Sequence, residues 1–330
     1  MNKPPSLLSF HSKKEHFVGD KLALVYAYTW PNYHRWLSRA PERITAEIGR
    51  AKLQEYMPEL LSTYDSLCHA FGADEQTGAF LSLYKPPTFR SGCSQACQVT
   101  GEIELVRNYD FPAKLCDRLL LHTNWNGTKV IAMTDCLWGV LDGMNEHGLA
   151  ISLAYGGRFK HGDGFAITLV LRYILEFCKN TEQAIEKLRS VPIHMAYNIT
   201  LLDRQGVAKT VVICPGEEIQ ITSLAFATNH QSGAVVENID VIADSYTREQ
   251  YIATRLADPK RQHNSLVNLF IEPPLLRKAS DWQDWGTLYT ARYLPLSGTV
   301  ELHWPNGQVL INSFEHFVEG SISVSSPAYI

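Results

Sequence analysis

The sequence lacks a strongly basic segment, a long apolar run and a paired-cysteine motif. Its 330 residues carry 30 Lys and Arg against 34 Asp and Glu, a formal net charge of -4, which gives no basic footprint for nucleic acid. No apolar stretch is long enough to cross a bilayer, and residues 1–11 do not have the pattern of a secretory signal. We therefore expect a cytoplasmic protein with neither a nucleic-acid nor a membrane partner.

The cysteines are also arranged without a metal or disulfide pattern. There are seven of them, an odd number, scattered without a C-x-x-C pair, which disfavours a disulfide framework and a zinc site. Walker loops, dinucleotide-binding glycine patterns and H-x-x-x-H metal motifs are absent as well. We expect no cofactor, no metal, and cysteines that are mostly buried free thiols.

What the sequence does contain is apolar material for one large domain or two small ones, with 45% hydrophobic residues. Periodicity predicts helices between residues 41 and 72, interrupted at Pro58, and at 164–178, 181–190 and 245–256. Strand-like runs fall at residues 80–84, 118–123, 128–134, 149–155, 197–203, 207–214, 223–228 and 288–311. Blocks of strands and helices in this order favour a layered α+β protein, with two sheets face to face and helices outside.

One stretch combines a thiol with charged residues. Cys93 follows Gly92 at the start of a short run, a Thr-Gly turn comes next, and a second run ends between Arg107 and Asp110. Two such runs predict a β-hairpin, which brings its two outer ends together. A neighbouring guanidinium favours the thiolate that a cysteine nucleophile needs. Cys93 is therefore the predicted nucleophile, and Cys97, two pleats later on the same face, is its rival.

The hairpin, followed by a segment from Asp142 to Gly148, resembles the N-terminal-nucleophile cysteine amidohydrolases. This superfamily includes the choloylglycine hydrolases, penicillin V acylases, acid ceramidase and isopenicillin N acyltransferases. The resemblance implies a four-layer αββα sandwich, with an additional mainly helical N-terminal segment. It also implies cleavage of the Gly92–Cys93 bond, which would make residues 1–92 a separate, tightly associated chain and residues 93–330 the catalytic chain.

The cleavage site has local features that fit such processing. Gly92 has no side chain, so a nucleophile can approach the preceding carbonyl closely. Residues 85–92 form a turn-rich linker, and scissile bonds favour exposed segments of this kind. We therefore expect the Gly92–Cys93 bond in an exposed, strained connection.

The resemblance also implies roles for residues around the thiol. The new α-amino group of Cys93 would be the base, Arg107 would lie against the thiol, and Asp110 would accept a hydrogen bond from the α-ammonium and orient it. Arg107 and Asp110 have a plainer alternative as an ion pair that closes a strand. Arg248, in a late Ser-containing segment, is the match for the family's arginine that completes the charge network, with Arg255 as the alternate.

Two further residues match the oxyanion site of the family. Asn229 follows a strand and would donate through its side-chain amide, although asparagine is also a common turn residue there. Tyr155 would donate through its backbone N–H, with its ring facing the pocket; a tyrosine at this place slightly disfavours bile salts as substrates. Asp142, Asn145 and Gly148 are assigned to turn geometry rather than to chemistry.

Together these residues predict a self-processing cysteine hydrolase that cleaves the linear amide bond of a small N-acyl compound. One alternative is an acyltransferase that passes the acyl group to an amine, and another is a non-catalytic binding module that retains the fold. A papain-like dyad would instead need a histidine near Cys93, with His147, His194 and His230 as candidates. The acyl and amine specificity and the oligomeric state, a homo-oligomer included, stay open.

Overall fold

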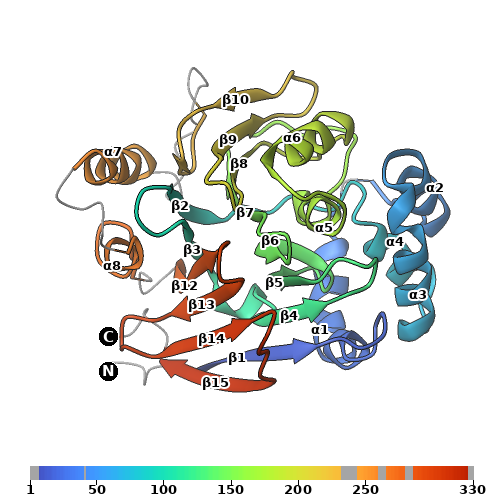
Figure 1. The fold of residues 1–330 in the computed structure, drawn as a ribbon. Coiled ribbons are helices and arrows are strands. Elements are labelled where there is room, and N and C mark those ends of the chain that lie inside the picture. Colours follow the sequence, from blue (N-terminus) through green and yellow to red (C-terminus); the bar gives the residue numbers. More distant parts are fainter. Residues whose placement is uncertain (1–6, 41, 232–243, 259–264, 279–284, 326–330) are drawn as a thin grey trace, which may run out of the picture.

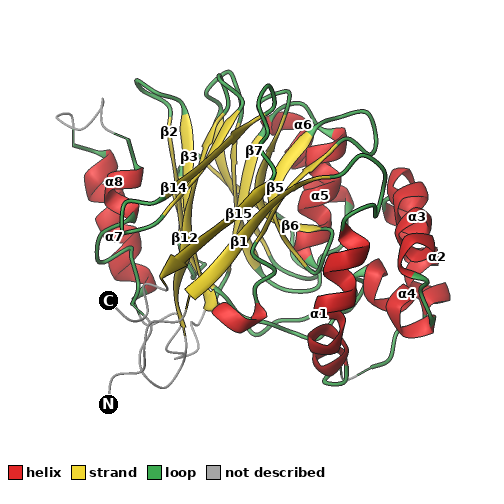
Figure 2. Ribbon diagram, turned by 90° about the horizontal axis from the view of Figure 1, so that it is seen from below, coloured by secondary structure: helices red, strands yellow, loops and turns green. Residues whose placement is uncertain are grey.

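The chain folds into two sheets packed face to face between layers of helices (Figures 1 and 2). The computed structural model describes residues 7–40, 42–231, 244–258, 265–278 and 285–325. Three apolar clusters separate the layers: one lies between each sheet and its helices and one lies between the two sheets. The predicted four-layer αββα sandwich is thus confirmed.

The larger sheet has nine strands among the described residues, in the order β10-β9-β8-β7-β6-β5-β4-β1-β15. The strands are β1 (Leu7–Lys14), β4 (Leu119–Thr123), β5 (Val130–Asp135), β6 (Gly139–Asn145), β7 (Ala150–Tyr155), β8 (Tyr197–Leu202), β9 (Ala208–Ile213), β10 (Gln220–Thr222) and β15 (Gly320–Ser325). Strands β4 to β8 are buried at every residue, because helices cover one face and the second sheet covers the other.

The smaller sheet carries the predicted hairpin near its centre. Its order is β11-β2-β3-β12-β13-β14. The strands are β11 (Phe226–Ala227), β2 (Gly92–Gln98), β3 (Glu104–Pro112), β12 (Trp285–Leu294), β13 (Thr299–His303) and β14 (Val309–Ser313). Alternate side chains of β2 point to opposite faces, so Cys93 and Cys97 join the cluster between the sheets while Ala96 joins the cluster on the outer face.

Helices cover both outer faces of this pair of sheets (Figure 2). The larger sheet is flanked by α1 (Leu22–Leu37), α2 (Ala46–Tyr56), α3 (Leu61–Phe71), α4 (Glu75–Ser82), α5 (Ile167–Phe177) and α6 (Thr181–Ser190). The smaller sheet is covered by α7 (Ser245–Leu256) and α8 (Val267–Phe270), and two 3₁₀ turns occupy Pro58–Leu60 and Ala113–Leu115. None of the described helices has the length and hydrophobicity to span a membrane.

The residues before Cys93 are built into the same body as those after it. Strand β1 lies between β4, to which it is parallel, and β15, to which it is antiparallel. Helices α1 to α4 contribute Leu22, Leu53, Leu67 and Phe80 to the cluster that α5 also buries. The N-terminal segment therefore completes the larger sheet and its helical layer; its predicted separation from the rest of the chain at Gly92 stays a prediction.

Several sequence predictions need correction. Residues 80–84 were expected as a strand, but α4 extends to Ser82, because Asp74 caps its first turn by accepting from the Thr77 N–H at 2.8 Å. Asp142 was assigned to a turn, but it lies within β6. Helix α1 was not predicted, since Pro31 stands inside it and proline normally interrupts a helix.

Other predictions are confirmed closely. Helices α6 and α7 have the predicted bounds, and α3 ends at Phe71, followed by Gly72, whose φ of 58° gives the left-handed C-cap that glycine favours. All seven cysteines are free thiols and six of them are buried.

Candidate active site

The hairpin places the predicted nucleophile beside a cation. In the β2–β3 ladder Cys93 lies opposite Tyr109, and Gln95 lies opposite Arg107. The guanidinium of Arg107 reaches back along the shared face, and its Nη2 lies 3.1 Å from Cys93 Sγ. The predicted contact between Arg107 and the thiol is therefore present in the structure.

Arg107 is held from its other side by Asp142. The two side chains form an ion pair in which both partners are fully buried, and Asp142 also accepts from the hydroxyls of Tyr289 at 2.8 Å and Tyr293 at 2.5 Å. A buried carboxylate with several donors fixes the guanidinium rigidly. The assignment of Asp142 to turn geometry is thus wrong, since its carboxylate is part of the site, whereas Asn145 and Gly148 do shape a turn.

The thiol itself is completely enclosed. Cys93 is 0% exposed, and burial raises the pKa of its thiol above the ordinary value, whereas the Arg107 charge acts in the opposite direction. The thiol donates to Ser91 Oγ at 3.7 Å. Burial therefore favours the protonated thiol, whereas the adjacent cation would stabilise its anion.

Asn229 holds the peptide group of the predicted cleavage site. Its Oδ1 accepts from the Cys93 N–H at 2.8 Å, and its Nδ2 donates to the carbonyls of Ser91 at 3.2 Å and Tyr155 at 3.1 Å. Its own backbone N–H donates to Ser245 Oγ at 2.7 Å. The side-chain amide predicted as an oxyanion donor therefore already lies against the backbone on both sides of Gly92.

Arg248 approaches the next peptide group, Cys93–Ser94, from the outer helix layer. It lies in the first turn of α7 and its Nη1 donates to the Cys93 carbonyl at 2.6 Å and to Ser94 Oγ at 2.7 Å, while its Nη2 donates to Asn229 Oδ1 at 3.0 Å. Burial lowers the pKa of Arg248, and the negative charge of Asp110 opposes this effect. Arg255 is exposed and lies over the Tyr251 ring, so the structure brings Arg248 to the site and leaves Arg255 outside.

Asp110 lies directly across the ladder from Gly92. Its Oδ1 accepts from Thr287 Oγ1 at 2.7 Å, and its Oδ2 has no hydrogen-bond partner among the described residues although it is buried. Burial raises the pKa of this carboxyl, against the charges of Arg248 and Arg277. A Cβ on Gly92 would lie 3.0 Å from Asp110 Cβ and 3.3 Å from Oδ2, so glycine leaves room for this carboxyl.

Tyr155 contributes its backbone to the site. Its carbonyl accepts from Asn229, while its ring belongs to the cluster between the larger sheet and the helices and its hydroxyl donates to the Arg158 carbonyl at 3.0 Å. The ring therefore packs toward the helical layer, not toward the thiol between the sheets. The role of the Tyr155 N–H as an oxyanion donor stays a prediction.

Sequence reasoning missed a polar network behind Asn229. Ser245 Oγ, besides accepting from Asn229, lies 2.7 Å from His230 Nδ1, and His230 Nε2 lies 3.0 Å from Glu249 Oε2. The serine at the start of the predicted helix 245–256 and the histidine after Asn229 were the available signals. No hydrogen bond joins His147, His194 or His230 to Cys93, so the described geometry does not form a papain-like dyad.

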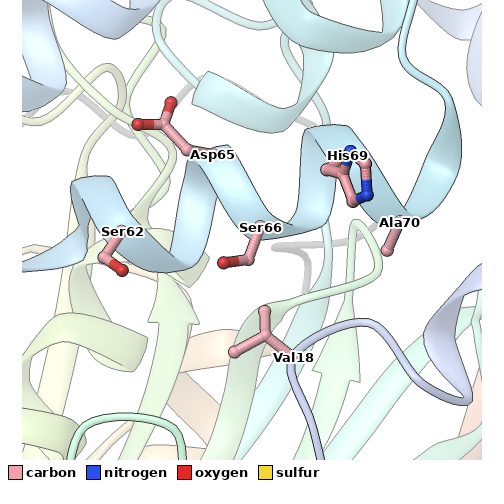
Figure 3. A pocket seen from close by; sticks show the side chains of 6 residues that line it. All are labelled: Val18, Ser62, Asp65, Ser66, His69 and Ala70. Atoms are coloured by element: carbon pink, nitrogen blue, oxygen red, sulfur yellow. The ribbon is translucent and has the colours of Figure 1, made fainter.

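The predicted cleavage site is also less exposed than the linker suggested. Gly92 is the first residue of β2, and Ser91, Gly92 and Cys93 are all buried. They are buried because the pairing of β2 with β3 already begins at Gly92. One open groove of the surface lies away from this site: it runs between α3 and the loop at Val18 and is lined by Ser62, Asp65, Ser66 and His69 (Figure 3). In the part of the chain that the structure describes, no group of three or more His, Cys, Asp or Glu is placed to hold a metal ion.

Comparison with known families and structures gives one sequence match. The family described as acyl-coenzyme A:6-aminopenicillanic acid acyl-transferase matches residues 99–308, a range that includes Arg107, Asp110, Tyr155, Asn229 and Arg248. No curated protein sequence matches the chain.

Several solved structures are similar to this chain at low sequence identity. Penicillin V acylase from Agrobacterium tumefaciens is 12% identical, with a TM-score of 0.49 over 72% of this chain and 93% of that one. A mutant conjugated bile acid hydrolase from Clostridium perfringens is 12% identical, with a TM-score of 0.48 over 70% and 96%. The N-acylethanolamine-hydrolyzing acid amidase ortholog of Caenorhabditis elegans is 16% identical, with a TM-score of 0.43 over 71% and 99%.

Proposed function

From the premise that this chain belongs to the acyl-coenzyme A:6-aminopenicillanic acid acyl-transferase family, enzymes that hydrolyse amides or transfer acyl groups, we propose a self-processing cysteine amidohydrolase. It would cleave its own Gly92–Cys93 bond and then the linear amide bond of a small N-acyl compound. The observation that carries the proposal is the pair of contacts at Cys93: Arg107 lies 3.1 Å from its sulfur and Asn229 lies 2.8 Å from its nitrogen.

Self-cleavage begins with the Cys93 sulfur adding to the Gly92 carbonyl carbon. The C–N bond then breaks, the nitrogen takes up a proton and becomes the α-amino group of Cys93, and Gly92 is left as a thioester on the sulfur. Water hydrolyses this thioester and releases the Gly92 carboxylate and the thiol. Since Cys93 is preceded by a residue without a side chain and is fully enclosed, its own backbone is the first amide within reach.

The mature site would use the new α-amino group as the base. An α-amino group titrates at roughly 7.7–8.0, close to neutral pH. In the uncut chain its nitrogen donates to Asn229 Oδ1, and the buried Asp110 Oδ2 lies across the ladder as a further acceptor for an ammonium. These two oxygens would orient the amine toward the thiol, and Arg107 would stabilise the thiolate that forms.

Substrate hydrolysis would repeat the same chemistry on an external amide. The thiolate adds to the substrate carbonyl, and Asn229 Nδ2, with the Tyr155 N–H as the predicted second donor, stabilises the oxyanion. The α-ammonium gives its proton to the leaving amine, and water resolves the thioester. The description of the matched family favours one alternative, in which an amine replaces water as acceptor; product analysis under excess amine separates the two.

The test is the mass of each chain under denaturing conditions. Purified wild-type protein should give two chains divided before Cys93, and Cys93→Ala should give one uncut chain. Cys97→Ala is the matched control: it removes a buried thiol from the same face of β2 and should be cleaved and active like the wild type.

Turnover of an N-acyl p-nitroanilide by the same three proteins completes the experiment. Cleavage and turnover in Cys93→Ala, or an uncut and inactive wild-type protein, would contradict the proposal. Loss of both cleavage and turnover in Cys97→Ala, with both retained in Cys93→Ala, would mean that Cys97 is the nucleophile.

A further inference from the structure

In the uncut chain, the residues before Cys93 form hydrogen bonds with side chains that a substrate would need to contact. The Ser91 carbonyl accepts from Asn229 Nδ2 at 3.2 Å, and Ser91 Oγ accepts from the Cys93 thiol at 3.7 Å. In the proposed function the first acyl group that Cys93 attacks is that of Gly92. The chain that leads to Gly92 therefore follows the direction in which the acyl part of an external substrate would extend.

Phe89 stands in this leading segment and turns inward. It packs against the cluster between the sheets, the cluster that also contains Cys93. Its ring lies 6.4 Å from the Phe111 ring and 6.2 Å from the Trp36 ring, both in edge-on geometry. Arg90, the next residue, is exposed and its guanidinium lies 3.7 Å from the Phe159 ring, so the apolar side chain of the segment is the one that faces the core.

The rings form a continuous path from the thiol to helix α1. Tyr109 lies opposite Cys93 in the ladder and stacks on Phe111 with 5.2 Å between ring centroids. Phe111 is followed by Phe89 and then by Trp36. Stacked and edge-on aromatic neighbours at these distances make a well-packed apolar surface.

We propose that Trp36 and Phe111 line the acyl-binding pocket of the mature enzyme, in the space that Phe89 fills in the uncut chain. The pocket takes an apolar acyl group that ends in an aromatic ring or a group of similar bulk. Three residue steps separate Phe89 from Gly92, which corresponds to a reach of roughly 10 Å from the reacting carbonyl. This inference rests on the proposed function and names the acyl half of its substrate.

The proposal makes residues 1–92 part of the active site. Trp36 lies on α1, and one turn earlier Tyr33 fixes this helix by donating to Asp117 Oδ1 at 2.6 Å and accepting from the Cys136 N–H at 2.9 Å. These contacts join the N-terminal segment to the catalytic chain and are independent of the bond at Gly92. After cleavage α1 would therefore keep Trp36 in place while the linker end leaves the site.

The experiment compares acyl groups on one leaving amine. Processed wild-type protein is assayed with p-nitroanilides of acetic, hexanoic and 4-phenylbutanoic acid, and kcat/KM should rise by about 100-fold from the first to the last, the size of effect expected when an apolar pocket is filled. Trp36→Ala and Phe111→Leu should each lower the ratio of 4-phenylbutanoyl to acetyl by about 10-fold. The ratio within one variant does not depend on how much of that protein is folded, and Trp36→Leu provides a second reading at the same position.

Trp30→Ala is the matched control. Trp30 lies on the same helix, but its ring packs against Tyr26 and Phe80 instead of Phe89, so this variant should keep the wild-type ratio. Equal kcat/KM for all three acyl groups in the wild type, or a wild-type ratio in Trp36→Ala, Trp36→Leu and Phe111→Leu, would overturn the pocket assignment while leaving the proposed function intact. A wild-type protein that is uncut and turns over none of the amides would contradict both the pocket assignment and the proposed function.

Discussion

The two ends of the β2–β3 hairpin hold similar thiols in different surroundings. Cys93 at the open end and Cys97 near the turn lie on the same face, and both belong to the cluster between the sheets. Burial raises the pKa of both thiols. The sulfur of Cys93, however, lies 3.1 Å from a guanidinium nitrogen of Arg107. At Cys97 the negative charge of Glu104 raises the pKa of the thiol further.

Two arginines at neighbouring positions of the β3–β12 ladder differ in the same way. Arg292 is surrounded by the carboxylates of Glu102, Glu104 and Glu301 near the turn, so its charge is neutralised within the ion-pair network. Arg107 pairs with one carboxylate, Asp142, and its Nη2 is directed to the Cys93 sulfur at the open end. Burial alone does not distinguish the two thiols; the difference is that a guanidinium donates to the sulfur of Cys93, whereas the carboxylate of Glu104 acts on Cys97.

The largest expected effect comes from removing these two arginines in turn. Arg107→Met leaves Asp142 buried without its cation, and Arg292→Met does the same to Glu104, so each should lower the free energy of unfolding by about 3–5 kcal/mol. Self-cleavage should be lost in Arg107→Met, because the thiolate loses its neighbouring cation, and should persist in Arg292→Met. Urea unfolding and chain masses of both variants measure the two properties.

The comparison fails if the two variants behave alike. Cleavage at the wild-type rate in folded Arg107→Met would mean that the guanidinium serves only the fold. Absence of cleavage in folded Arg292→Met would mean that the turn end takes part in the reaction.

A smaller effect is expected from the asparagines. Asn229→Ala removes the predicted oxyanion donor and should lower kcat by about 10²–10³-fold. Asn108→Ala is a matched control on the hairpin: Asn108 is buried too, but its amide donates to the Phe270 and Leu275 carbonyls on the outer face, at 2.7 and 3.0 Å. It should lose stability and keep kcat in steady-state assays. Equal losses of kcat in the two variants would contradict the role of Asn229.

The smallest effect concerns the pH dependence of self-cleavage. Gly92→Ala should slow cleavage enough to follow it, because the new Cβ would lie 3.0 Å from Asp110 Cβ and 3.4 Å from an Arg277 guanidinium nitrogen. Since the pKa of the Cys93 thiol is raised above its ordinary value, the thiolate fraction grows with pH across the neutral range. The rate should therefore rise by about tenfold per pH unit from pH 6 to 8.

Chain masses over time at each pH measure that rate. The double variant Gly92→Ala, Cys97→Ala should give the same dependence of cleavage rate on pH, since the thiol of Cys97 takes no part in self-cleavage. A rate that is constant between pH 6 and 8 would exclude loss of the thiol proton as the step that limits cleavage.

Local patterns in the sequence were sufficient for part of the site. The hairpin was predicted from two short runs and a Thr-Gly turn, and its register then placed Cys93 and Arg107 on one face. The periodic pattern of residues 245–256 predicted the start of α7, which places Arg248 in its first turn. These features depend on neighbours within a few residues, so their signals are local.

Other parts of the site had no local signal. Asp142 was placed in a turn because Asp-Gly is a turn pair, yet β6 extends through it and its carboxylate meets Arg107 from the opposite sheet. The strand predicted at residues 80–84 is the end of α4, where packing on α2 and α3 outweighs β propensity. The ring of Tyr155 points toward the helices, which follows from its alternation with Ala154 in β7.

The sequence by itself determined the elements that carry the candidate site: a hairpin with a cysteine and an arginine on one face, an asparagine after a strand, and an arginine in the first turn of a helix. The tertiary structure alone decided which groups meet. Asp142 pairs with Arg107, Asn229 spans the peptides around Gly92, and Trp36 of the N-terminal segment lies beside Phe89. The physical reason is that turn, cap and strand preferences act over a few residues, whereas these contacts join residues from different layers, and packing of the two sheets fixes their distance.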